Sequence, residues 1–192
     1  EDKQLIKSMI ENTAREIYVK KILEENPFLL KDNLDFPAIK QKKYTQAEIR
    51  FKNEANGSPL QWSLWPTDRQ KHAVLSSGGK DSLLTFGVLK EISKDVFPIF
   101  VNESGRHWFT ALNAFKYFKK NVQNTARVWT NSDRVFNWML RHMPFIRQNY
   151  ASIRADEYPI RLWTVAIFLF AVLPMLRKYE IGRIVIGDEY DT

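Results

Sequence analysis

Residues 72–82 have the sequence His72-Ala73-Val74-Leu75-Ser76-Ser77-Gly78-Gly79-Lys80-Asp81-Ser82. The run 72–76 is short and mostly apolar, as in a buried strand, and the following residues 83–92 have helical character. The two adjacent glycines can adopt positive φ and let backbone N–H groups approach an anion closely, while a helix start adds unpaired donors and the positive end of the helix dipole. The stretch therefore predicts a strand, a glycine turn and a helix that together bind phosphate.

This stretch differs from a Walker A loop, which has a glycine, four further residues and then Gly-Lys followed by Ser or Thr. The corresponding positions here are Val74 and Asp81, so that interpretation fails. The pattern Ser-Gly-Gly-x-Asp-Ser directly after a strand instead resembles the pyrophosphate loop (PP-loop) of the N-type ATP pyrophosphatases. That superfamily cleaves ATP between its α and β phosphates to adenylate a substrate. The alternative is a glycine-rich turn that binds no ligand.

The resemblance implies a role for the residues of this loop. Lys80 would neutralise the phosphates, and Asp81 would orient the loop or bind Mg²⁺. The residues expected to bind ATP here are Ser76, Ser77, Gly78, Gly79, Lys80, Asp81 and Ser82. ATP and Mg²⁺ are therefore the expected cofactors.

Composition restricts the function classes. The net charge of +7 favours polyanionic partners such as nucleotides, RNA or an acidic substrate, although no block of like charges marks a nucleic-acid tail. The absence of cysteine excludes disulfides, Cys-x-x-Cys metal sites and a thiol nucleophile in this chain.

The longest apolar run, residues 162–176, contains Pro174 and is shorter than the roughly 20 residues of a membrane span. It predicts a buried helix, no membrane partner and a cytoplasmic location.

The first third of the chain has a different pattern from the rest. Residues 3–25 have apolar positions at helical spacing, and Pro27 ends that predicted helix. Residues 47–51 and 60–65 both alternate between apolar and polar, with Asn56-Gly57 between them, which predicts a β-hairpin. We therefore expect an N-terminal appendage over residues 1–68 and an ATP-binding α/β domain over residues 69–192.

After residue 71 the pattern alternates between strands and helices, which predicts an α/β fold with a doubly wound parallel sheet. The predicted strands are residues 73–76, 96–101, 126–129 and 183–186, and the predicted helices are 83–92, 106–119, 133–143 and 160–178. Ligands of such sheets bind beyond the carboxyl ends of the strands. One shared site is therefore expected from the loops 77–82, 102–108, 130–133 and 187–191.

The loop 102–108 gathers several reactive groups just past a predicted strand. Arg106 could clamp a carboxylate or phosphate, and Trp108 could stack on a base. Glu103 or His107 could move a proton near neutral pH. The alternative is a helix cap with a solvated arginine and a buried tryptophan.

The end of the chain, Gly187-Asp188-Glu189-Tyr190-Asp191, follows a strand rich in Val and Ile. Three acids within four residues suit Mg²⁺ held between carboxylates and phosphates. The alternative is a solvated acidic chain end. PP-loop proteins often have a second glycine-led loop here that ends in aspartate, which Asp191 matches as a metal ligand. Gly187, Asp188 and Glu189 are expected to bind ATP, although that family commonly has His or Asn in place of Asp188.

A fourth polar cluster precedes the apolar run 162–176. It contains Arg154, Asp156, Glu157 and Arg161. From physical chemistry alone, a salt-bridged surface is the favoured interpretation. Asp156 and Glu157 nevertheless remain candidates for acid–base chemistry.

Four segments together resemble one particular branch of the superfamily, the UDP-N-acetylmuramoyl-L-alanyl-L-glutamate epimerase family. The segments are residues 75–82, 100–108, 156–163 and 187–192, and the resemblance covers about residues 70–192. It implies an isomerase of peptidoglycan precursor synthesis that uses ATP and Mg²⁺ to invert a terminal L-glutamate to D-glutamate, releasing AMP and pyrophosphate. Asn102 joins the expected ATP-binding residues. Members of the family are longer, so the domain is expected to be incomplete at its C-terminus.

The implied chemistry suits these residue types. Deprotonating Cα beside a free carboxylate would place two negative charges side by side, so the carboxylate must first be neutralised, which adenylation does. The candidate acids and bases are Glu103, His107, Asp156 and Glu157, while Lys80, Arg106 or Mg²⁺ at Asp81 would stabilise the enolate. The absence of cysteine excludes the two-thiol route of cofactor-free racemases.

Two other function classes remain open from the sequence. One is another PP-loop adenylating ligase, including enzymes that modify tRNA, because the chain is basic. Thiolases of that group generally need cysteines, which are absent here. The other class is a nucleotide-binding module without catalysis, against which the charged pair Lys80-Asp81 argues.

Overall fold

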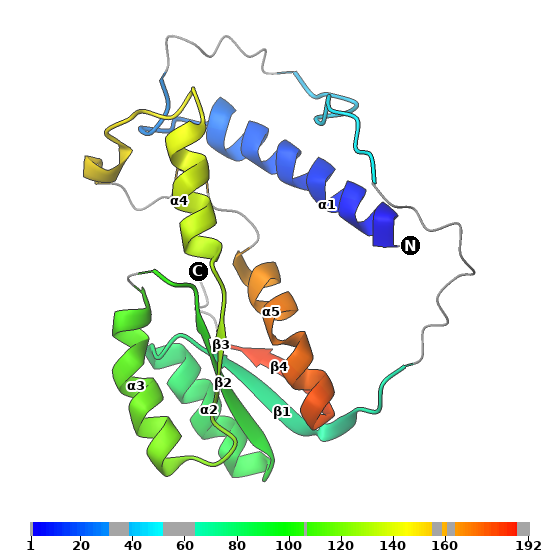
Figure 1. Cartoon of the computed structure of the whole chain (residues 1–192), viewed down its shortest axis with the longest axis vertical. Helices are drawn as coiled ribbons and strands as arrows, with labels where there is room; N and C mark the ends of the chain where they lie inside the picture. The colour runs from blue at the N-terminus through cyan, green and yellow to red at the C-terminus, as the bar shows by residue number, and fades with distance from the viewer. Residues whose placement is uncertain are drawn as a thin grey trace. The chain divides into compact units, whose positions relative to one another are not determined.

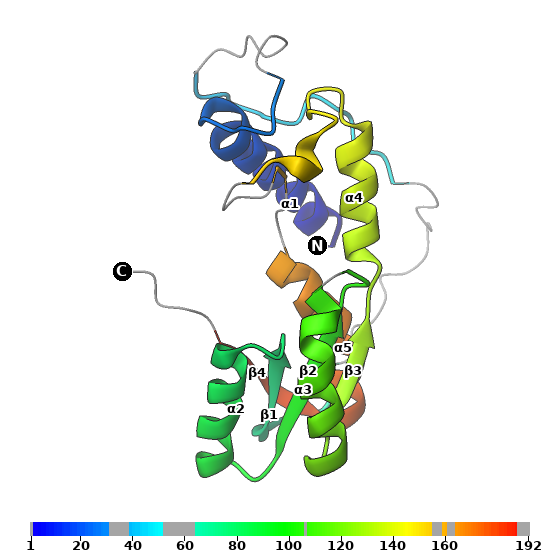
Figure 2. The same ribbon diagram turned by 90° about the vertical axis from the view of Figure 1, so that its left-hand side faces the viewer.

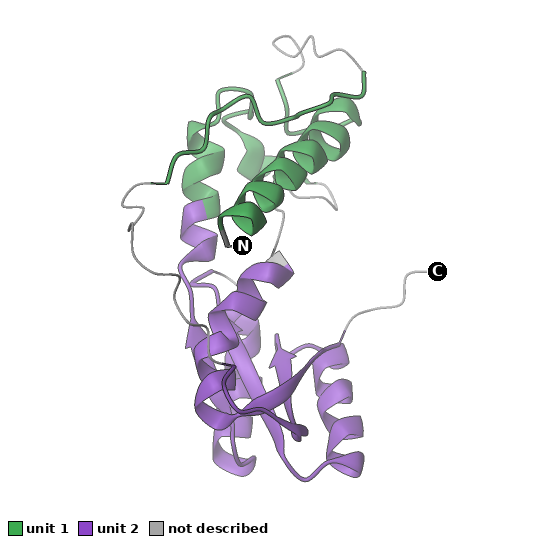
Figure 3. Cartoon of the chain, turned by 90° about the vertical axis from the view of Figure 1, so that its right-hand side faces the viewer, with its two compact units in different colours: residues 1–61, 136–163 green, residues 62–135, 164–192 purple. Residues whose placement is uncertain are grey.

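The computed structural model describes residues 2–30, 39–51, 64–105, 107–154, 159–160 and 164–187. The chain divides into two compact units (Figure 3). Unit 1 comprises Glu1–Gln61 and Phe136–Trp163, and unit 2 comprises Trp62–Val135 and Thr164–Thr192. The sequence predicted one boundary near residue 68, whereas this division groups residues 136–163 with the N-terminal segment.

Unit 2 is built on a four-stranded sheet in which every pair of neighbouring strands is parallel (Figure 1). The strands are β1 (Asp68–Ser76), β2 (Val96–Asn102), β3 (Ala126–Trp129) and β4 (Ile181–Ile186). Their order across the sheet is β3-β2-β1-β4. The predicted α/β class with a wound parallel sheet is therefore confirmed.

The predicted helices form between the strands. They are α2 (Lys80–Ile92), α3 (His107–Asn121), α4 (Ser132–His142) and α5 (Thr164–Tyr179). The prediction that the last helix starts at residue 160 is wrong, because Ile160 is buried against Leu29 and Ile146 of unit 1 instead. Among the described residues, no helix is long and apolar enough to cross a membrane.

Both faces of the sheet are buried, which explains the nearly continuous apolar runs of its central strands. On one face, Leu75 and Ile99 pack with Val172 of α5. Helices α2 and α3 cover the other face (Figure 2). There Val74 packs with Leu89 of α2, and Phe100 packs with α3. Successive residues of a strand thus serve opposite helix layers, as the period of two requires.

The strand order places a topological switch point between β1 and β4. From β1 the chain winds through α2 and α3 on one face to β2 and β3, and it then returns through α5 on the other face to β4. Ligands of open parallel sheets bind at this point, outside the carboxyl ends of the strands.

Unit 1 begins with the predicted N-terminal helix. It comprises α1 (Asp2–Ile17) and a π-helical extension, η1 (Tyr18–Leu23). Its small core contains Leu29, Ile146 and Ile160. The expected hairpin is wrong in its first strand, because residues 47–51 have no strand structure, and most of its second strand lies outside the described residues.

The segment before residues 47–51 is held by α1. The Glu11 carboxylate accepts hydrogen bonds from the backbone N–H groups of Tyr44 (2.6 Å) and Thr45 (3.0 Å). These bonds lower the pKa of Glu11 below its ordinary value, and the bond from Tyr44 has the largest effect. Tyr44 also contacts η1, because its ring centroid lies 5.5 Å from that of Tyr18.

Replacing Glu11 with alanine is expected to raise the hydrogen-exchange rates of the Tyr44 and Thr45 amides. Because the folded-state pKa of Glu11 is depressed, its contribution is present above the unfolded-state pKa and is lost as pH falls through the folded-state value. Amide exchange measured by NMR against pH tests this. Glu16→Ala, on the same helix, is the matched control, and equal effects of both variants would contradict the anchoring role.

Candidate functional site

The loop between β1 and α2 is fixed by two buried serines. The Gly78 N–H donates to Ser76 Oγ (3.1 Å), and Ser76 Oγ lies 3.1 Å from Ser82 Oγ. The Ser82 hydroxyl in turn donates to the Gly79 carbonyl oxygen (3.0 Å). One direction of proton donation satisfies all three bonds, with Ser76 donating to Ser82. Both hydroxyl protons therefore stabilise the turn itself.

Gly78 is required by its conformation and by its neighbours. Its φ is +77°, in the left-handed region, and an added Cβ would lie 2.9 Å from Ala111 Cα and 3.2 Å from Ala114 Cβ of α3. The loop thus packs directly on α3 at two alanines. Any side chain at this position would meet both a conformational cost and a steric one.

The solvent side of the loop is open. Gly79 precedes α2 and provides no side-chain cap, and an added Cβ there would meet only Ser77 Oγ, at 3.4 Å. Ser77, Gly79 and Lys80 are exposed, and Asp81 is half-buried in the first turn of α2. The backbone N–H groups of that first turn have no intrahelical acceptor, so this face is suited to an anion.

The end of β4 reaches the same loop. An added Cβ at Gly187 would lie 2.7 Å from the Asp81 carbonyl oxygen and would overlap Thr85 Oγ1. Thr85 Oγ1 itself donates to that carbonyl (2.7 Å). The structure therefore brings Gly187 against the first turn of α2, as expected for strands that flank a switch point.

The ends of β2 and β3 are joined by a polar network. The Ser104 N–H donates to Asn102 Oδ1 (2.8 Å), and the Ser104 hydroxyl donates to the Thr130 carbonyl (2.7 Å). Ser104 has a φ of +66°, and Asn102 is buried. Asn102 therefore shapes the loop in which Glu103 lies.

Two carboxylates lie in this network. Glu103 Oε1 is 3.5 Å from Ser132 Oγ at the start of α4, and the Asp133 N–H donates to the Glu103 carbonyl oxygen (3.3 Å). The Asp133 carboxylate lies against Gly105, where an added Cβ would overlap it. Both acids are half-buried. Asp133 was not named as a site residue, although it ends the loop 130–133 that was expected to contribute to the site.

Several predicted site residues are not among the described side chains. Arg106, Asp156, Glu157, Asp188, Glu189 and Asp191 lie outside the described residues, and His107 begins α3 without a described side chain. Within the described ranges, no group of three or more His, Asp or Glu side chains could hold a metal ion. Trp108 is half-buried, and its ring lies 5.5 Å from that of Phe115, so it packs against its own helix.

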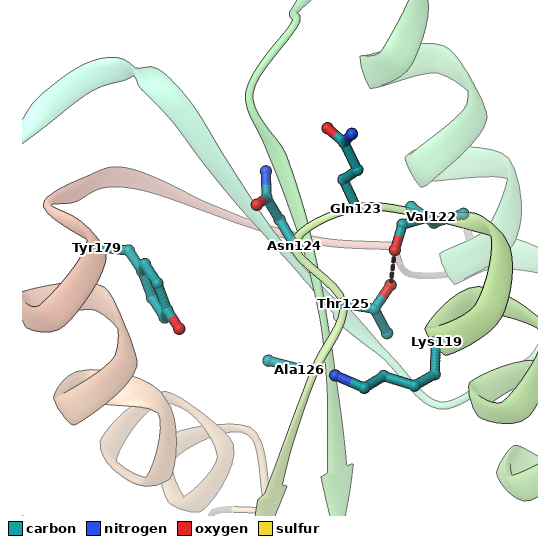
Figure 4. A pocket seen from close by; sticks show the side chains of 7 residues that line it. All are labelled: Lys119, Val122, Gln123, Asn124, Thr125, Ala126 and Tyr179. Carbon is teal, nitrogen blue, oxygen red and sulfur yellow. Dashed lines mark hydrogen bonds between the residues drawn. The ribbon is translucent and has the colours of Figure 1, made fainter.

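A pocket of about 340 Å³ lies away from these residues (Figure 4). It is lined by residues 122–126 with Lys119 and Tyr179. Ala126 is the first residue of β3, so the pocket is at the amino edge of the sheet, opposite the carboxyl edge where the loops gather. None of the predicted site residues lines it.

No protein-family model, curated protein or solved structure matches this chain. The inference about function therefore rests on the site itself. Its described parts are an open glycine turn at the switch point and a neighbouring loop with two carboxylates. Such a combination can bind a phosphate group and accept a proton nearby.

Proposed function

We propose that unit 2 binds ATP at the β1–α2 loop and cleaves it between the α and β phosphates to adenylate a carboxylate. The observation that carries this proposal is the open glycine turn at the switch point, where Gly79 leaves the first turn of α2 uncapped. The phosphates would be held by the N–H groups of this turn, by Ser77 and by Lys80. The hydrogen bonds of Ser76 and Ser82 within the loop would keep those donors in place.

Mg²⁺ would neutralise the pyrophosphate as it leaves. Asp81 and Asp191 are the proposed ligands, with Asp188 and Glu189 beside the phosphates. The close approach of Gly187 to Asp81 supports this assignment, because it starts the acidic segment next to the loop. The PP-loop type of the fold is part of the same proposal.

The finer proposal is an epimerase that acts on the terminal L-glutamate of UDP-N-acetylmuramoyl-L-alanyl-L-glutamate, in cytoplasmic synthesis of peptidoglycan precursors. A carboxylate oxygen attacks the α phosphorus and pyrophosphate leaves. Glu103 then takes the Cα proton from one face, and His107, Asp156 or Glu157 returns a proton to the other. Water finally releases AMP and the D-glutamyl product. The Ser132 contact and the backbone bond from Asp133 support Glu103 as a positioned base.

Incubation of the protein with ATP, Mg²⁺ and the UDP-linked dipeptide in heavy water tests both the adenylation and the epimerisation. We expect AMP, detected by chromatography, together with one deuterium at the glutamate Cα, detected by mass spectrometry. AMP without deuterium would support adenylation and overturn the epimerase. If neither AMP nor deuterated product forms, with this substrate or with other carboxylates, adenylation and epimerisation are both overturned. That result would favour a nucleotide-binding module.

A second candidate is an RNA-directed adenylating enzyme. It is favoured by one observation, the concentration of positive charge in residues 104–155. In that case AMP release would require RNA in place of the dipeptide. The same ATP loop would serve both reactions, so only the second substrate distinguishes them.

A further inference from the structure

The positive charge of the chain is concentrated in one continuous segment. Residues 104–155 contain nine Lys and Arg residues and a single acid, Asp133, which gives a net charge of +8. The whole chain has +7, so the remainder is close to neutral. Such segregation is typical of proteins with a polyanionic partner.

In unit 2 this segment forms the outer edge of the sheet, because β3 is the last strand on its side. We use the name basic edge for exposed residues of this strand and of the preceding helix α3. They are Arg127 and Trp129 of β3, and Lys116, Lys119 and Lys120 of α3. Arg127 and Trp129 are two positions apart on β3 and thus point to the same face of the sheet. The Arg127 guanidinium lies 5.4 Å from the ring of Trp108 and 5.6 Å from that of Phe115, which joins β3 to α3.

The described part of the chain provides no ion-pair partner for the cations of the basic edge. Over the described ranges, no carboxylate lies within ion-pair distance of Lys116, Lys119, Lys120 or Arg127. The one acid of the segment, Asp133, lies against Gly105 in the loop network instead. The edge therefore presents uncompensated charge to solvent.

Exposed aromatic side chains accompany the cations. The Trp129 side chain is 58% exposed, and Tyr117, which lies between Lys116 and Lys120 on α3, is 63% exposed. If the partner were an acidic peptide, the positive charges would be sufficient and the exposed rings would have no role. Cations that follow a backbone, with rings on which bases stack, are the features of surfaces that bind single-stranded nucleic acid.

We propose that the basic edge binds single-stranded nucleic acid, with phosphates on the lysines and Arg127 and a base stacked on Trp129. β3 alone extends over roughly 13 Å, at about 3.3 Å per residue, so the surface suits a polymer better than a small ligand. Trp129 directly precedes Thr130, whose carbonyl oxygen binds Ser104 in the candidate site. A bound strand would therefore end beside that site.

Fluorescence anisotropy of a labelled 20-nucleotide oligouridylate, titrated with the full 192-residue chain without ATP, tests this proposal. We expect a Kd on the order of 1–10 µM in 50 mM salt, weakening with a log–log slope of about −3 for four phosphate contacts. Replacing Lys116, Lys119 and Lys120 with glutamine should reduce that slope by about 2. The matched control replaces Lys40, Lys42 and Lys43 of unit 1 with glutamine and should leave the slope unchanged.

A tryptophan pair tests the stacking. Trp129→Ala should weaken binding by at least about 5-fold, the lower limit for loss of one stacked base. The Trp65 ring lies 6.0 Å from the Arg177 guanidinium, away from the basic edge, so Trp65→Ala should leave binding unchanged. The melting temperature of each variant confirms that it is folded.

The proposal would be overturned by no binding at 100 µM protein in 50 mM salt, by equal losses in the two lysine variants, or by a Trp129→Ala variant that binds like the wild type. Competition by polyglutamate as strong as by unlabelled oligouridylate would also overturn it, by showing a general anion surface. Because the assay contains no ATP, its failure leaves the proposed adenylation untouched.

Discussion

Replacing Lys80 with methionine is expected to lower the rate of AMP and pyrophosphate release by about 10²- to 10³-fold, the usual cost of losing one group that stabilises transition-state charge. Lys80 is exposed at the first position of α2, where the open turn leaves room for phosphates. Methionine keeps the unbranched shape and the helix propensity of the side chain, is one atom shorter, and removes the charge. Release of AMP from ATP with the UDP-linked dipeptide is the measurement.

Lys90→Met is the matched control for this variant. Lys90 is exposed in the last turn of the same helix, far from the loop, so AMP release should be unchanged. Both substitutions should alter the free energy of unfolding by no more than about 0.5 kcal/mol, as surface changes usually do. If the two variants release AMP at equal rates, the assignment of the β1–α2 loop to the phosphates is wrong.

The β1–α2 loop could be predicted from the sequence because its signals are local. An apolar run, two glycines and a helix start lie next to one another in residues 72–92, and each fixes the backbone in its own neighbourhood. The structure forms β1 and α2 from these residues, with Gly78 at positive φ. Local chemistry thus determined this part of the site.

The neighbouring carboxylates could be predicted only in part. Glu103 follows a recognisable strand, but Asp133 reaches Gly105 only because β3 pairs with β2 in a particular register, in which Asn102 lies beside Trp129. Register is a tertiary property that no motif records. The predicted strand at residues 47–51 failed for a similar reason, because Glu11 binds the preceding segment through its backbone.

The second large effect concerns Gly78, where alanine is expected to lower the free energy of unfolding by about 1–3 kcal/mol. Alanine disfavours a φ of +77°, and its Cβ would lie 2.9 Å from the backbone Cα of Ala111, which cannot rotate away. Either the loop or α3 must shift, and the bond from the Gly78 N–H to Ser76 Oγ would be strained with it. The loss should appear as a Tm lower by several degrees and as weaker ATP binding, measured by thermal denaturation and calorimetry.

Gly87 provides the control, because it is a nearby glycine whose surroundings can accept a side chain. It lies inside α2, it is exposed, and an added Cβ would meet no atom within 4 Å. Alanine there should raise the free energy of unfolding by about 0.5–1 kcal/mol, since it improves helix propensity and restricts the unfolded chain. Opposite shifts in Tm for the two glycine variants are therefore expected. A Gly78→Ala variant that is as stable as Gly87→Ala would show that the turn is not held in the left-handed conformation against α3. The proposed phosphate site, which depends on this turn, would then lose its structural basis.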